Sequence, residues 1–360
     1  MYKREANHLS TLILFLFTLL PAVSPALSNG KGDLRVMNYN IYEGTNFTEI
    51  TNAHDLNSFL VAVGDTVAQV RATDPPQRMR AVARQILSAS PTVVSLEEVA
   101  RWSTGSFDPA TQTCGTMNLE FDTLQELLDS LSAQGGHYQV AVQAVQWAFP
   151  PVPGITASGT FFCAQFIGYN VILARTDLGS IFSWSNPQSG LYVARIFANT
   201  PIGMLPLPRA WESIDVQFHN RTFRFIGTDF DAVDANVREQ QASELRTGAA
   251  NTSLPLVLAM DSNSQAAPLP QDPAYLDFIA AGYNDVWAQI HPRTIGLTCC
   301  QNEFVNNPIS QFFTRIDLIL LLGPANAQQI ELFGDQPADC TPSGLWPSDH
   351  AGIAAQRVVR

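Results

Sequence analysis

The chain has 360 residues and a formal net charge of −12, and 46% of its residues are hydrophobic while 14% are charged. This composition allows a sizeable buried core and excludes global disorder. The acidic balance disfavours a stable complex with long DNA or RNA, because contacts of lysine and arginine to phosphates supply most of the non-specific affinity for nucleic acids.

Residues 1–28 have the order of a secretory signal peptide. Lys3 and Arg4 precede an apolar run over residues 12–20, and small residues follow it. The run is too short for an ordinary membrane span, and a buried N-terminal helix is the alternative interpretation. We expect the mature chain, residues 29–360, to be secreted or periplasmic and to have no transmembrane segment.

The first hundred residues predict a β-α-β unit. Residues 34–41 alternate as a strand does, and apolar residues at helical spacing over 56–70 predict a helix. A second helix is expected after Pro75, because proline is tolerated in the first helical turn. A buried strand over 92–96 then leads directly into Glu98.

The remaining pattern mixes strands and helices along the whole chain. Further helices are expected over 124–131, 235–246 and 275–281. Further strands are expected over 138–142, 167–173, 213–218, 222–228, 254–260, 315–322 and 352–359. Loops are expected over 100–118, 149–154 and 183–208. Because no linker or repeat interrupts this order, we expect one α/β domain over residues 29–360.

The five cysteines are disulfide candidates in an exported protein. We expect Cys114 to pair with Cys163, and Cys340 to pair with either Cys299 or Cys300. The remaining cysteine would stay reduced. Two Cys-x-x-Cys pairs are absent from the sequence, so a structural zinc site is not expected.

Carboxylate and amide side chains stand at the ends of several predicted strands. Asn40, Glu98, Asp261, Asn263 and Asp317 all occupy such positions. Hydrolysis of a phosphate ester needs a divalent cation, an activated water and a group that stabilises the leaving oxygen. Carboxylate and amide oxygens suit a hard cation such as Mg²⁺. The alternative for each residue is a solvated loop or an Asx-turn that ends a strand.

The adjacent residues Asp349 and His350 add a proton-handling group near the end of the chain. A buried carboxylate such as Asp317 can fix the tautomer of a histidine and stabilise its imidazolium. Taken alone, an Asp-His dipeptide is more typical of a surface turn. The carboxylates earlier in the sequence are therefore the reason to interpret this dipeptide as part of a catalytic site.

Six short segments in chain order resemble the endonuclease/exonuclease/phosphatase superfamily. They are Asn38–Ile41, Leu96–Val99, Gly168–Arg175, Met260–Asn263, Arg315–Asp317 and Ser348–His350. The superfamily includes deoxyribonuclease-like enzymes, abasic-site endonucleases, inositol polyphosphate phosphatases and neutral sphingomyelinases. The resemblance extends from about Asp33 to Arg360, and residues 297–301 and 344–350 are similar to a secreted bacterial-type branch.

This resemblance implies an α/β fold, a four-layer αββα sandwich with two packed mixed β-sheets and the site at one edge of the sheets. It implies that Asn40 and Glu98 lie near a Mg²⁺ or Mn²⁺ ion, with Asp349 as a further metal contact.

The same resemblance implies the catalytic roles. His350 would contact the scissile phosphate and would be oriented by Asp317. Asp261 would activate or position water, and Asn263 would hold a phosphate oxygen.

One position departs from the family pattern. Asp229 stands where many members have a histidine that donates to a phosphate oxygen. A carboxylate there repels phosphate unless it is protonated or reaches a cation. We therefore expect a secreted, divalent-metal-dependent phosphoesterase that hydrolyses a phosphodiester, namely a small diester, a lipid head group or a nucleic acid. The alternatives are a weakened or inactive binding protein on the same fold, and a structural exported domain.

Overall fold

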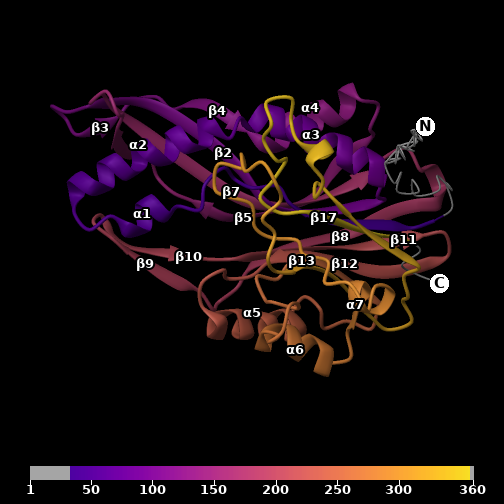
Figure 1. The fold of residues 1–360 in the computed structure, drawn as a ribbon. Coiled ribbons are helices and arrows are strands. Elements are labelled where there is room, and N and C mark those ends of the chain that lie inside the picture. The colour runs from indigo at the N-terminus through magenta and orange to yellow at the C-terminus, as the bar shows by residue number, and fades with distance from the viewer. Residues whose placement is uncertain (1–32, 357–360) are drawn as a thin grey trace, which may run out of the picture.

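The computed structural model describes residues 33–356, so the predicted signal peptide over 1–28 lies outside the described residues. Two β-sheets pack face to face, and helices cover the outer face of each sheet (Figure 1). This arrangement confirms the predicted four-layer αββα sandwich.

The first sheet has the strand order β16-β17-β1-β2-β7-β5, with β3 and β4 paired to β2 and β6 paired to β7. Its strands are β1 Arg35–Asn40, β2 Val93–Asp108, β3 Thr113–Cys114, β4 Asn118–Asp122, β5 Tyr138–Ala148, β6 Val152–Ile155, β7 Phe161–Arg175, β16 Gln329–Phe333 and β17 Gly352–Gln356. Strands β1 and β2 run parallel, while the other pairs are antiparallel, so the sheet is mixed.

The second sheet has the order β14-β15-β13-β12-β11-β8, and only its β12–β13 pair is parallel. Its strands are β8 Phe182–Leu191, β11 Ala210–Phe218, β12 Arg221–Asp229, β13 Leu256–Asp261, β14 Asn284–Asp285 and β15 Asp317–Leu322. Two strands, β9 Ile196–Thr200 and β10 Gly203–Leu207, pair only with each other and form a separate hairpin.

Six of the seven α-helices in the described residues, all except α1, begin with an aspartate cap. The seven helices are α1 Thr48–Asn52, α2 Leu56–Ala72, α3 Pro75–Ala89, α4 Thr123–Ala133, α5 Ala235–Thr247, α6 Pro273–Ala280 and α7 Val286–Ile290, with 3₁₀ turns over Gly179–Ile181 and Pro337–Asp339. The side chains of Asp55, Asp74 and Asp122 accept hydrogen bonds from the first turns of α2, α3 and α4. No helix within residues 33–356 is long and apolar enough to cross a membrane.

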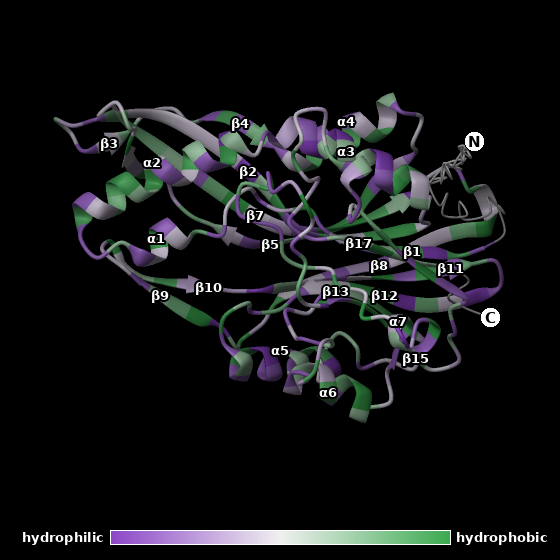
Figure 2. Ribbon diagram, in the orientation of Figure 1, coloured by the Kyte–Doolittle hydropathy of each residue, from purple (hydrophilic) through white to green (hydrophobic). Residues whose placement is uncertain are grey.

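Apolar side chains fill three layers between these elements. Val36, Ile172, Phe225 and Val257 belong to the core between the two sheets, and each is fully buried. Helices α3 and α4 bury their apolar stripes on the first sheet, and α5 and α6 do so on the second. Figure 2 shows that hydrophilic and hydrophobic residues alternate along the helices.

Two predicted loops are strands, so these expectations were wrong. Over residues 100–118, β2 continues to Asp108 and β3 forms; over residues 183–208 lie β8, β9 and β10. The predicted loop over 149–154 also contains most of β6. These segments hide their strand character because many of their side chains are exposed, and the sequence alternation of a half-buried strand is therefore missing.

The cysteine prediction was half right. Cys114 in β3 and Cys163 in β7 form the expected disulfide. The second expectation was wrong, because Cys299 pairs with its neighbour Cys300 and Cys340 is a free thiol. Cys340 instead packs against an apolar cluster that includes Trp346.

We expect the double substitution Cys114→Ser and Cys163→Ser to lower the free energy of unfolding by about 2–4 kcal/mol, because the disulfide closes a loop with a sequence separation of 49. Urea denaturation under oxidising conditions measures this loss. Cys340→Ser is the matched control, since it breaks no disulfide. An unchanged midpoint in the double variant would show that the bridge contributes nothing.

Candidate active site

The register of the two sheets brings distant carboxylates to one edge of the sandwich. In the second sheet, Asp229, Asp261 and Asp317 are cross-strand neighbours at the ends of β12, β13 and β15. The first sheet reaches the same place, since the Asn40 amide Nδ2 donates to Asp261 Oδ2 at 3.0 Å and the Asn38 Nδ2 donates to Asp317 Oδ1 at 3.4 Å. The predicted strand-end residues therefore meet across the inter-sheet space.

His350 forms a buried pair with Asp317. The distance from His350 Nδ1 to Asp317 Oδ2 is 2.9 Å, and His350 Nε2 lies 4.0 Å from Asp261 Oδ2. Burial lowers the pKa of His350, but the Asp317, Asp261 and Asp349 carboxylates outweigh this effect and raise it well above its usual value. The carboxylates thus favour the protonated form of the ring, whose Nε2 lies on the side of Asp261.

Asp261 is fixed by three donors. Its Oδ1 accepts from the Asn263 backbone N–H at 3.0 Å, and its Oδ2 accepts from Asn40. Asn263 has a φ of 46°, so the chain turns after β13 in the Asx-turn that the sequence left as an alternative. The turn still keeps the Asn263 amide Nδ2 within 3.4 Å of Asp261 Oδ2. Burial raises the pKa of Asp261 to about 6, with His350 opposing this effect and Asp317 adding to it.

Glu98 and Asp349 form a second, half-buried acidic group. Glu98 has a φ of 54° in a bulge of β2 opposite β7, which re-aims its side chain. Burial, and then the Asp349 carboxylate, raise the pKa of Glu98 to about 7, while His350 and Asn40 lower it. Burial also raises the pKa of Asp349, against lowering by His350 and Arg78. The side chains of Glu98 and His350 therefore lie close enough to interact electrostatically.

Two donor sets can be considered for a divalent cation. The ligand atoms of Asp261, Asp317 and His350 lie within 4.8 Å of one another, which makes a possible Asp/His metal site. Within this set His350 already hydrogen-bonds Asp317, and Asp261 accepts from Asn40 and from the Asn263 N–H. Glu98 and Asp349 are the second set, and neither makes an ion pair with arginine or lysine within residues 33–356.

Arg78, which the sequence analysis missed, holds the loops that carry these residues. Its fully buried guanidinium donates to the backbone carbonyls of Ile41 at 2.9 Å, Tyr42 at 3.0 Å, Thr73 at 3.0 Å and Pro347 at 3.2 Å. It therefore ties the chain after β1 to the segment before Asp349. An arginine within the apolar stripe of a predicted helix was the sequence signal for it.

Asp229 is paired with a cation. Its buried carboxylate forms an ion pair with Arg209 Nη1 and accepts from Asn170 Nδ2 at 2.9 Å and from Gln146 Nε2 at 3.4 Å. Burial lowers the pKa of Arg209, but Asp229, with a further contribution from Glu98, outweighs this and raises it. The Arg209 Nε–H has no hydrogen-bond partner within the described residues. Sequence reasoning missed Arg209, which lies just after an expected loop.

Solved structures match this fold over most of the chain. An endonuclease/exonuclease/phosphatase family protein from Bacteroides thetaiotaomicron is 17% identical with a TM-score of 0.54, and the match covers 91% of this chain and 95% of that chain. A mannosyl-6-phosphatase from the same organism is 17% identical, with a TM-score of 0.52 and coverage of 89% and 98%. TDP2 from D. rerio, in complex with a single-strand DNA product, is 14% identical, with a TM-score of 0.53 and coverage of 90% and 98%.

The chain therefore has the endonuclease/exonuclease/phosphatase fold, which confirms the resemblance that the six segments indicated. No protein-family model matches the sequence, and no curated protein matches it significantly. The similarity to the secreted bacterial-type branch stays a prediction.

We expect Arg78→Lys to lower the free energy of unfolding by about 3 kcal/mol or more, because a single ammonium cannot serve all the buried carbonyls that the guanidinium bonds. Urea denaturation measures the loss. Arg84→Lys on the exposed side of the same helix is the control and should change stability by less than about 0.5 kcal/mol. Equal effects of the two substitutions would contradict the role given to Arg78.

The raised pKa values predict a pH-dependent stabilisation by Mg²⁺. Between the usual pKa of a glutamate and about 7, the folded protein holds a proton on Glu98 that the unfolded chain releases, so stability falls as pH rises through this range. A divalent cation interacts with the ionised carboxylates. Differential scanning fluorimetry should therefore show a larger increase of Tm with Mg²⁺ at about pH 8 than at about pH 5. Glu98→Gln should reduce the increase at the higher pH, and an undiminished increase would exclude Glu98 as a ligand.

Proposed function

We propose that this protein is an exported, divalent-metal-dependent phosphoesterase that hydrolyses a phosphodiester. The observation that carries the proposal is the His350–Asp317 pair, which faces Asp261 and lies close to the acids Glu98 and Asp349. Its fold neighbours include a mannosyl-6-phosphatase and TDP2 with bound DNA product, which supports chemistry at phosphate esters.

We assign metal binding, phosphate binding and water activation to different residues of the site. Glu98 and Asp349, with Asn40, would hold Mg²⁺ or Mn²⁺, which would neutralise charge on the phosphoryl oxygens. The His350 imidazolium is placed to donate from Nε2 to the phosphate, with Asp317 holding its tautomer. Asp261 is placed to orient water and accept its proton, and the Asn40 amide fixes the direction of this carboxylate.

The charge of the site favours a diester over a monoester. The described centre gathers Glu98, Asp261, Asp317 and Asp349 around one imidazolium. A diester carries less negative charge than the dianion of a monoester, so it meets less repulsion from these carboxylates. The same reasoning, with the acidic balance of the whole chain, disfavours long nucleic acids as substrates.

Asp229 does not require the alternative of an inactive binding protein. The repulsion between its carboxylate and a phosphate motivated that alternative, yet Arg209 neutralises this charge. The guanidinium also brings an unused Nε–H donor, which is the kind of group that the family histidine supplies. Export is supported by the sequence of residues 1–28 and agrees with the Cys114–Cys163 disulfide.

We expect His350→Ala to lower kcat for bis(p-nitrophenyl) phosphate by at least about 10²-fold, because a group that handles a proton or binds the phosphate is removed. Hydrolysis should also require Mg²⁺ or Mn²⁺ and stop on addition of a chelator. p-Nitrophenyl phosphate, a monoester, should be the poorer substrate. His54→Ala is the matched control, since its side chain is 82% exposed. Full turnover in the His350 variant, or in the presence of chelator, would reject the proposal.

A further inference from the structure

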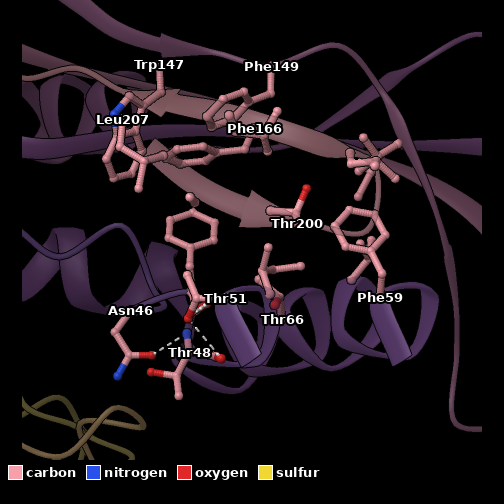
Figure 3. A pocket seen from close by; sticks show the side chains of 18 of the residues that line it. Asn46, Thr48, Thr51, Phe59, Thr66, Trp147, Phe149, Phe166, Thr200 and Leu207 are labelled. Carbon is pink, nitrogen blue, oxygen red and sulfur yellow. Dashed lines mark hydrogen bonds between the residues drawn. The ribbon is translucent and has the colours of Figure 1, made fainter. Parts of the chain in front are cut away.

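An apolar pocket includes Arg209, the ion-pair partner of Asp229, in its lining. It has a volume of about 390 Å³ and is enclosed by helices α1 and α2, the strands β5 and β7, and the β9–β10 hairpin. Figure 3 shows Trp147, Phe149 and Phe166 on one side of it, and Phe59 and Thr66 of α2 on another. Ligand pockets for organic molecules have this size and this predominantly apolar lining.

The hairpin lines the pocket with alternate residues. Ile196, Ala198 and Thr200 of β9 line it, while the intervening Phe197 and Asn199 do not. This alternation is the two-residue period of a strand, so one face of the hairpin covers the pocket and the other faces away. The lining residue Ala198 is small, which leaves space between the hairpin and the aromatic side chains.

The charged end of the pocket is connected to the proposed catalytic centre through Arg209. Arg209 and Asp231 are the only ionisable residues among the pocket's described lining. The Arg209 guanidinium lies 5.2 Å from the ring centroid of Trp147, inside the pocket lining, and its other side pairs with Asp229. Asp229 is the cross-strand neighbour of Asp261, so one cation connects the apolar space to the proposed catalytic acids.

We propose that this pocket binds the apolar ester group of the substrate, so that the substrate class is an amphiphilic phosphodiester. This inference rests on the proposed function. The position of Arg209 between Asp229 and Trp147 favours this occupant. A phosphate held by His350 and Arg209 would direct an attached hydrocarbon group into the aromatic lining of the pocket. Arg209 would lie beside the phosphate, and Trp147 would contact the first carbons of the group.

The test is a series of p-nitrophenyl alkyl phosphates with methyl, butyl and octyl groups. Burial of each methylene should raise kcat/KM by about three- to fourfold until the pocket is full. Ala198→Trp, which fills the pocket, should bring the kcat/KM values of the three esters to within about twofold of one another. Circular dichroism reports whether the variant folds.

Asn199→Trp places the same ring on the opposite face of β9 and is the matched control, which should keep the dependence on chain length. Equal kcat/KM for methyl and octyl esters in the wild type would overturn the pocket assignment and leave the proposed function in place. Identical behaviour of Ala198→Trp and Asn199→Trp would overturn the assignment in the same way.

Calorimetric binding of butyl and octyl phosphate separates the two proposals. If no ester is hydrolysed, tighter binding of octyl phosphate that is lost in Ala198→Trp supports the pocket and rejects the enzyme. Absence of such binding rejects the pocket as well.

The source of the amphiphile is decided by two further substrates. Dihexanoyl phosphatidylcholine below its micelle concentration represents a dissolved substrate, and vesicles of long-chain phosphatidylcholine represent a bilayer. The outer surface of the hairpin exposes Phe197 and Met204, which are 57% and 70% exposed. If the bilayer is the source, Phe197→Ser with Met204→Ser should slow vesicle hydrolysis alone; if dissolved lipid is the source, vesicles should not be hydrolysed by either protein.

Discussion

The approach of buried carboxylates from two different sheets is the constraint on which the rest of the site depends. Strand register places Asp261 beside Asp317, and Glu98 and Asp349 come to the same edge. Such a concentration of negative charge is unfavourable when water is excluded. Its effects are visible in the raised pKa values of Glu98 and of His350. A cation bound among these carboxylates would remove the same repulsion.

The two buried arginines near these carboxylates have different roles. Arg78 donates to backbone carbonyls and makes no ion pair within residues 33–356, so it fixes loops. Arg209 neutralises Asp229 and keeps one donor unused. This side of the site therefore carries a positive charge beside the Asp229 carboxylate. The same guanidinium also lies over Trp147 in the apolar pocket.

Sequence reasoning found the parts of the site that local patterns report. Asn40, Asp261 and Asp317 follow or begin apolar strands, and their positions were readable because such strands end at a common edge. Arg209 could not be recognised from the sequence, since its role depends on Asp229, which lies 20 residues later and becomes adjacent only when β11 pairs with β12. The end of β2 was also missed in the sequence. Its side chains are largely exposed, so the alternation of apolar and polar residues that marks a half-buried strand is absent there.

The β9–β10 hairpin forms one wall of the pocket proposed to bind the substrate. A two-stranded hairpin is marginally stable alone, so it needs packing against the rest of the protein. The inner face of β9 carries Ile196, Ala198 and Thr200, while Phe197 is exposed. Because Ala198 and Thr200 are small, the inner face leaves an apolar space open next to Arg209. An apolar substituent on a bound phosphate would need such a space.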